Sequence, residues 1–212
     1  MNDTIEAGQT YVGGSATCGG SESGGVVTFP VGTMTAGQVT ACSFQVIIDG
    51  GLGSTEFFFD DFEDGSFGNW TSTGLWNPET EGDSCGSVHA PFPSSNNAAY
   101  FGQSGSCNFN TGSAVTGALS MNNDVALAGG SAPVLNFSYF LETEQFIGYD
   151  EAFVEISTNG GSTWSLLLQV TDSGWQAVST DLSAYAGSNV RIRFRFDSGD
   201  SINNNYFGWL VD

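Results

Sequence analysis

Five acidic residues could form a metal site. Four lie near residue 60 and one ends the sequence: Asp60, Asp61, Glu63, Asp64 and Asp212. Carboxylate oxygens suit Ca²⁺, which accepts about six to eight oxygen ligands in loose geometry. If the segment around Phe62 is a strand, alternation places Asp61 and Glu63 on one face. We predict a structural calcium bound by Asp61, Glu63 and Asp212.

Asp60 and Asp150 are further candidate ligands for this ion. The spacing of these acids does not follow the calcium-binding loop of EF-hands. The alternative is that these carboxylates only hydrate an exposed strand end, as most surface acids do.

The positive side chains form a second pattern. The chain has no lysine, and its arginines alternate with apolar residues at Arg191, Arg193 and Arg195. Such alternation predicts a half-buried strand with all arginines on one face. Glu151 and Glu155 alternate in the same way, and opposite charges across antiparallel strands contribute about 0.2–1 kcal/mol. We predict that the two strands are neighbours joined by ion pairs; an anion or acidic-glycan site is the alternative.

Two aromatic residues are candidates for stacking on sugars. Trp76 and Phe92 lie in the Gly-, Pro- and Ser-rich stretch 73–97, where we expect exposed loops. Most aromatic side chains of a small β-domain are buried, so packing in the core is the alternative.

The four cysteines form two local pairs, Cys18 with Cys42 and Cys85 with Cys107. No C-x-x-C or Cys/His cluster predicts zinc. We expect two disulfides and an extracellular or cell-surface location; four free thiols are the alternative. No signal peptide follows Met1 and no apolar run is long enough to span a membrane, so we interpret the sequence as a fragment of a secreted protein.

Composition excludes several classes of function. The net charge of −20 leaves no basic patch for nucleic acid or anionic membranes. The only histidine, His89, cannot form an H-E-x-x-H zinc site, and no Gly-x-Ser-x-Gly motif is present. We therefore predict that the chain is not an enzyme.

We expect an all-β chain with a unit at 1–50, a linker at 51–55 and a domain at 56–212. In the first unit, 24–32 and 39–48 read as strands. Short strands at even spacing in the second unit predict a jelly-roll sandwich. They are expected at 97–102, 115–121, 134–141, 152–157, 164–170, 175–180, 190–196 and 206–211.

Three motifs in the second unit occur in a recognisable order. They are Asp-Phe-Glu-Asp-Gly at 61–65, Val-Glu-Ile-Ser-Thr-Asn-Gly-Gly-Ser-Thr-Trp at 154–164, and Val-Arg-Ile-Arg-Phe-Arg-Phe-Asp at 190–197 followed by Gly-Trp-Leu-Val-Asp at 208–212. Together they resemble the MAM-like jelly-roll accessory domains of immune-inhibitor-A-type metallopeptidases and bacterial surface adhesins. The resemblance implies a structural calcium where the first and last strands meet. It departs at the end, where such domains continue into another Asp and a closing strand.

The first unit resembles the last strands of immunoglobulin-like repeats in bacterial surface proteins, through Phe29-Pro30-Val31-Gly32 and the alternating segment after it. Within the second unit, 157–164 is similar to an Asp-box, with Asn159 in place of the Asp, and we interpret it as a structural hairpin.

These observations predict a non-catalytic module of a larger extracellular protein, acting in adhesion, glycan contact or spacing. Its partners would be a glycan or a cell-surface protein. Two alternatives remain: a filament subunit that exchanges strands between copies, and an accessory domain of a secreted metallopeptidase.

Overall fold

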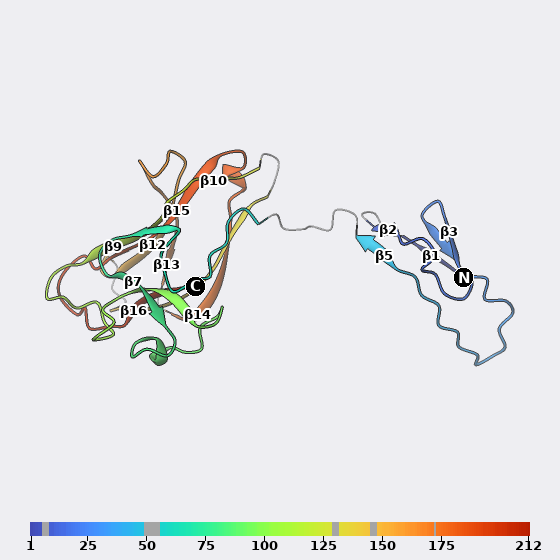
Figure 1. Ribbon diagram of the computed structural model, residues 1–212, viewed down its shortest axis with the longest axis horizontal. Coiled ribbons are helices and arrows are strands. Elements are labelled where there is room, and N and C mark those ends of the chain that lie inside the picture. The colour runs from blue at the N-terminus through green and yellow to red at the C-terminus, as the bar shows by residue number, and fades with distance from the viewer. Residues whose placement is uncertain (6–8, 49–55, 129–131, 145–147, 172) are drawn as a thin grey trace. The chain divides into compact units, whose positions relative to one another are not determined.

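The chain forms two compact units, Met1–Thr55 and Glu56–Asp212. The computed structural model describes residues 1–5, 9–48, 56–128, 132–144, 148–171 and 173–212 (Figure 1). The predicted linker at 51–55 lies outside the described residues.

In the described part of the first unit, the helices and strands are limited to five short strands. They are β1 (Asn2–Thr4), β2 (Gln9–Tyr11), β3 (Ser21–Ser23), β4 (Val26–Thr28) and β5 (Val46–Ile48). One sheet has the order β1-β4-β3, and the other pairs β2 with β5. The predicted strand 39–48 is therefore regular only at its end. Ser43 explains part of this, because its N–H donates to the side-chain hydroxyl of Thr17 at 2.7 Å instead of to a backbone carbonyl. The disulfide Cys18–Cys42 joins the same two segments, because each cysteine is the neighbour of Thr17 or Ser43.

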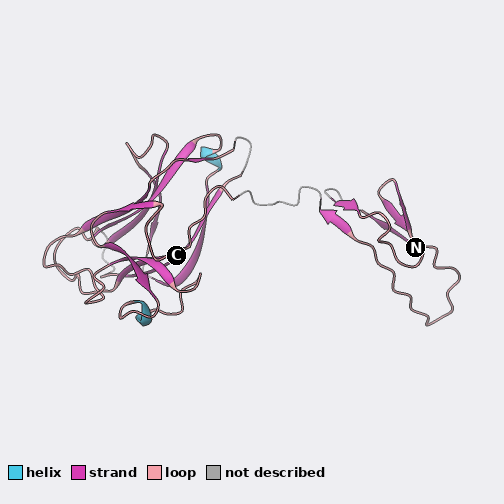
Figure 2. Ribbon diagram, viewed as in Figure 1, coloured by secondary structure: helices cyan, strands magenta, loops and turns pink. Residues whose placement is uncertain are grey.

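Where the structure describes it, the second unit is built from strands and two short 3₁₀ helices (Figure 2). The strands are β6 (Trp70–Ser72), β7 (Trp76–Thr80), β8 (Asn97–Phe101), β9 (Thr116–Met121), β10 (Val125–Ala126), β11 (Val134–Glu142), β12 (Glu151–Ser157), β13 (Ser165–Val170), β14 (Ser173–Asp181), β15 (Asn189–Asp197) and β16 (Gly208–Val211). The helices are η1 (Gly86–Val88) and η2 (Ser183–Tyr185). Within the described residues, no helix is both long and apolar enough to cross a membrane.

Two antiparallel sheets form the second unit. One has the order β13-β12-β15-β9-β6, with β10 also paired to β15, and the other has the order β14-β11-β16-β8-β7. The sheets pack through alternating apolar side chains, a pattern typical of sandwiches. The predicted all-β jelly-roll sandwich, preceded by a short β segment, is confirmed.

The core between the sheets is rich in aromatic rings. In β15, residues 190, 192, 194 and 196 are buried while the arginines between them are half-buried. Phe194 contacts Trp209 of β16 with ring centroids 5.7 Å apart, and Trp70 of β6 at 5.8 Å. Burial of such rings is the main stabilising contribution expected for a domain of this kind.

The segment that opens the second unit is not a strand, contrary to the prediction. Phe62 has a φ of +57°, which reverses the chain locally. Asp60 and Asp61 each accept a hydrogen bond from the N–H two residues ahead, at 3.0 and 3.2 Å. These bonds are typical of Asx turns, which compete with strand pairing.

Candidate functional site

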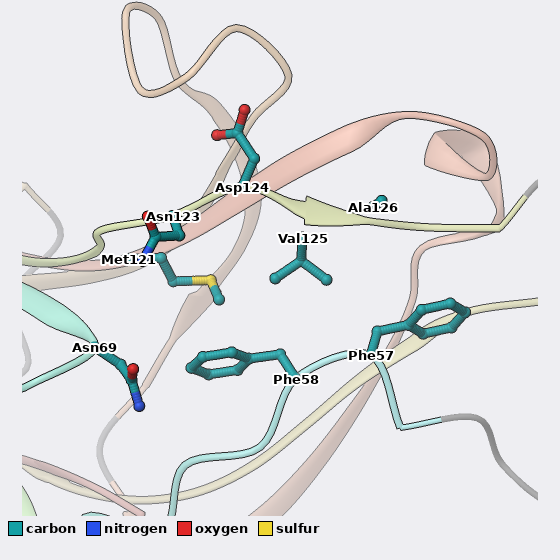
Figure 3. A pocket seen from close by; sticks show the side chains of 8 residues that line it. All are labelled: Phe57, Phe58, Asn69, Met121, Asn123, Asp124, Val125 and Ala126. Atoms are coloured by element: carbon teal, nitrogen blue, oxygen red, sulfur yellow. The ribbon is translucent and has the colours of Figure 1, made fainter.

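A half-open hollow lies at one end of the first sheet of the second unit. Its volume is about 400 Å³, within the range of about 300–1,000 Å³ found for ligand sites. Figure 3 shows the lining side chains, which are Phe57, Phe58, Asn69, Met121, Asn123, Asp124, Val125 and Ala126.

Three segments distant in sequence meet at the hollow. Strand β6 pairs with β9 so that Trp70 lies opposite Met121, which brings Asn69 to the turn after β9. That turn leads into β10, where Val125 pairs with Val190 of β15. The backbone N–H of Asn122 donates to the carbonyl of Asn69 at 2.9 Å and holds the turn after β9 beside the residue that precedes β6. The turn residue Asp124 and the strand residue Val125 therefore occupy fixed positions.

The ring of Phe58 lies beside Val125 and Met121 (Figure 3). It packs edge-on against Trp70, with centroids 5.8 Å apart, and is still 38% exposed. A ring held from below and open above offers a flat apolar surface to a ligand.

Asp60 holds the rim next to Phe58. Its Oδ2 accepts hydrogen bonds from Asn69 Nδ2 at 2.9 Å and from Trp70 Nε1 at 3.0 Å. This hydrogen bond uses one N–H of the Asn69 amide and orients the group, which leaves its oxygen and its second N–H for an incoming hydroxyl.

The opposite rim carries Asp124. Its side chain points away from Phe58 and Met121 (Figure 3), and its Oδ1 accepts a hydrogen bond from Arg191 Nε at 2.5 Å. The carboxylate is thereby neutralised locally. The hollow thus combines an apolar floor with amide groups, an arrangement that can hold the apolar face and hydroxyls of a sugar ring.

The predicted calcium ligands Asp61, Glu63 and Asp212 converge on the segment 94–97. Glu63 Oε1 accepts hydrogen bonds from the backbone N–H groups of Asn96 and Asn97, both at 2.7 Å. The carboxylate of Asp212 accepts one from the Ser94 N–H at 2.7 Å and another from the Ser94 hydroxyl. The Ser94 hydroxyl also lies 3.4 Å from the carbonyl oxygen of Asp61.

The pKa values reflect these surroundings. Burial raises the pKa of Asp212, and the nearby charges of Glu63 and Asp61 raise it further, against the hydrogen bonds from Ser94. The backbone N–H of Asn97 lowers the pKa of Glu63. Among the described residues, however, no group of three or more carboxylates, histidines or cysteines is arranged to hold a metal ion.

The two further candidate ligands have different surroundings. Asp60 belongs to the rim of the hollow through Asn69 and Trp70. Asp150 is buried beside Ser198, whose carbonyl accepts the Asp150 N–H at 3.2 Å, and its Oδ2 accepts the N–H of Glu144.

The expectation that Trp76 and Phe92 are exposed was wrong, because they are only 5% and 4% exposed. Strand β7 pairs with β8 and carries Trp76 into the core, where its ring lies 5.3 Å from that of Trp209. Phe92 packs on Trp175 at 5.7 Å. The disulfide Cys85–Cys107 lies within the same unit, and buried Cys85 shares a small cluster with Phe92.

The strand of Glu151 and Glu155 does lie next to the arginine strand, as predicted. Glu155 contacts both Arg193 at 2.6 Å and Arg195 at 3.2 Å. Glu151 does not join them, because it lies opposite Asp197 and accepts a hydrogen bond from Gln169 at 3.3 Å. Besides Glu155, Arg195 also pairs with Asp197, at 3.3 Å.

The guanidinium groups also cover aromatic rings of the outer face. Arg193 Cζ lies 4.5 Å from the ring centroid of Trp164, and Arg195 Cζ lies 4.3 Å from that of Phe153. These contacts indicate a structural role for Arg193 and Arg195.

Sequence reasoning missed Phe58, Asn69, Asn123 and Asp124 as candidate site residues. A weak signal was present, since three consecutive Phe residues at 57–59 exceed what one strand face can bury. The Asn-Asn-Asp turn at 122–124 after an alternating strand was a second signal.

No protein family and no curated protein matches the sequence. Among solved structures, TmCBM61 in complex with beta-1,4-galactotriose is similar at 18% identity, over 71% of this chain and 89% of the other, with a TM-score of 0.45. The K2 cleaved adhesin domain of Lys-gingipain matches at 16% identity over 73% and 95%, with a TM-score of 0.46. The K1 cleaved adhesin domain of Lys-gingipain from Porphyromonas gingivalis W83 matches at 16% identity over 72% and 95%, with a TM-score of 0.42. At these values the likeness assigns neither a family nor a ligand to this chain.

Proposed function

We propose that this chain is a non-catalytic extracellular module that contacts glycans through the hollow at Phe58. The observation that carries the proposal is a ring that is held on one side by Trp70 and open on the other, beside the amides of Asn69 and Asn123. Sugar rings have apolar C–H faces that pack on such a ring and hydroxyls that bond to amides. The two disulfides support an oxidising, extracellular compartment.

The test is a glycan-array screen followed by calorimetric titration of the strongest ligand. Phe58→Ala should weaken binding about tenfold or more, which corresponds to about 1.4 kcal/mol. The matched control is Phe59→Ala, because Phe59 is 63% exposed and does not line the hollow. If no glycan binds, or if Phe58→Ala and Phe59→Ala bind equally well, the proposal is wrong.

We also propose a structural calcium at Glu63 and Asp212, with Asp61 beside them. The support is the convergence of these acids on the segment 94–97, where burial and then the nearby charges of Glu63 and Asp61 raise the pKa of Asp212. A cation would offset this cost of holding Asp212 ionised. To bind the ion, the carboxylates of Glu63 and Asp212 would have to give up part of the hydrogen bonding that they now accept from the N–H groups of 94–97.

Chelation with EGTA should then lower the melting temperature, because a ligand bound only by the native state stabilises it. Glu63→Gln should abolish that dependence. Asp64→Asn is the control, since the side chain of Asp64 accepts hydrogen bonds from the backbone N–H and the hydroxyl of Ser66, in its own turn. A melting temperature that EGTA does not change would contradict the calcium proposal and leave the glycan proposal standing.

The wider role we propose is adhesion or spacing within a larger secreted protein, in keeping with the resemblance to MAM-like accessory domains. Strand exchange between copies gains no support from β16, which is hydrogen-bonded to β11 on one side and to β8 on the other.

A further inference from the structure

We infer that the hollow selects neutral sugars and rejects sugars that carry carboxylate or sulfate groups, and that Asp124 sets this preference. The inference rests on the glycan-contact function proposed above and names the ligand class of the same site.

The first argument is the charge of the hollow. Of its eight lining residues, Asp124 is the only one with an acidic or basic side chain. Arg191 offsets its charge, but none of the eight lining residues is positively charged, so an anionic ligand gains no attraction there and approaches against the net charge of −20 of the chain. Repulsion of this kind is a common means of rejecting a wrong ligand.

The second argument concerns the available cations. The chain has three arginines and no lysine. Arg193 and Arg195 are engaged with Glu155 on the outer face of the sheet. Arg191 does not line the hollow, but its Nε lies 2.5 Å from Oδ1 of Asp124, which does. An anionic sugar would therefore compete with Asp124 for this guanidinium.

The third argument concerns what a neutral sugar would find. Phe58, Met121 and Val125 form an apolar floor, and Asp60 holds the Asn69 amide so that its oxygen accepts from a hydroxyl. Amides and apolar side chains bind hydroxyl-rich neutral rings without a change in net charge. Affinity for a neutral glycan should therefore change little with ionic strength.

The experiment compares a neutral oligosaccharide from the screen with the same oligosaccharide oxidised at C6 to its uronic acid. The wild-type protein should bind the neutral form at least about tenfold more tightly. Asp124→Asn should improve binding of the oxidised form by about tenfold at low ionic strength, because it frees Arg191, and high salt should abolish the gain.

Two variants serve as controls. Asp197→Asn releases an arginine contact at Arg195, away from the hollow, and should give no gain. Adding Arg191→Gln to Asp124→Asn should remove the gain. Tryptophan fluorescence reports whether each variant is folded.

The outcomes separate the two proposals. If the wild-type protein binds the oxidised form as tightly as the neutral form, the selectivity inference is overturned and the glycan function stands. If it binds neither, the glycan function fails and the inference fails with it. If the wild type prefers the neutral form but Asp124→Asn gains nothing, the role assigned to Asp124 is wrong.

Discussion

Glu155 of β12 lies directly opposite Arg193 of β15, and Arg193 Nε donates to Glu155 Oε2 at 2.6 Å. Arg195 donates to the same carboxylate oxygen at 3.2 Å. One carboxylate, in a residue that is 8% exposed, thus balances two guanidinium groups in the middle of a sheet face. Its removal would leave like charges side by side.

Glu155→Gln should therefore destabilise the second unit by about 1–3 kcal/mol, less than a fully buried pair because the arginines remain partly exposed. Urea unfolding followed by tryptophan fluorescence measures this change. The matched control is Glu151→Gln on the same strand, which should change stability by less than about 0.5 kcal/mol because Glu151 has no arginine partner among the described residues. Equal effects of the two substitutions would contradict the assigned ion pairs.

The two disulfides should act on separate unfolding transitions. Replacing Cys85 and Cys107 with Ser should cost the second unit about 2–4 kcal/mol, since the bridge closes a loop across a sequence separation of 22. All five tryptophans lie in this unit, so their fluorescence reports its transition. Replacing Cys18 and Cys42 with Ser should leave that transition in place, and a shared loss of stability would show that the units unfold together.

The stability of the protein should depend on pH through Asp212. Because its folded pKa is raised above 3.8, the native state holds this proton more tightly than the unfolded state. The resulting stability is present below pH 3.8 and is lost as the pH rises through the folded pKa. In EGTA, the free energy of unfolding of the wild type, relative to Asp212→Asn, should fall over this window. A difference between the two that rises with pH would contradict the burial of Asp212.

His89 should show the opposite dependence. Its ring stacks on Phe140 with centroids 3.8 Å apart, and burial lowers its pKa below 6.5 even though Glu142 lies 3.9 Å away and is well exposed. The native state therefore keeps His89 neutral, and its contribution to stability is lost as the pH falls from 6.5 through the folded pKa. As the chain has one histidine, an NMR titration reports this pKa without ambiguity. A value at or above 6.5 would show that Glu142 outweighs burial.

The strands of the second unit could be predicted where one face is buried and the other is not. In β11 the residues at 137, 139 and 141 are buried and those between them are not, so alternation was visible in the sequence. Edge strands β6 and β7 were missed because they are short and β7 contains a proline at position 78. The opening segment was mispredicted because the positive φ at Phe62 has no signal in residue type.

The candidate site was harder to predict than the fold. Phe58, Asn69 and Asp124 come from three separate segments, and only the register of β6 with β9 brings them together. Trp76 and Phe92 were assigned to exposed loops because their surroundings are rich in Gly, Pro and Ser. The pairing of β7 with β8 buries Trp76 instead. Local composition does not reveal such long-range pairing.

Strand β16 lies between β11 and β8, so within this sheet the paired strands β7 and β8 are hydrogen-bonded to the paired strands β11 and β14 through Gly208–Val211. These four residues are synthesised after all the strands that precede them in the sequence. Until they emerge, Trp76 and Phe194 lack the indole of Trp209 that covers them in the finished domain. Before β16 is synthesised, the nascent domain therefore exposes aromatic surface that is prone to aggregation and that a chaperone would protect.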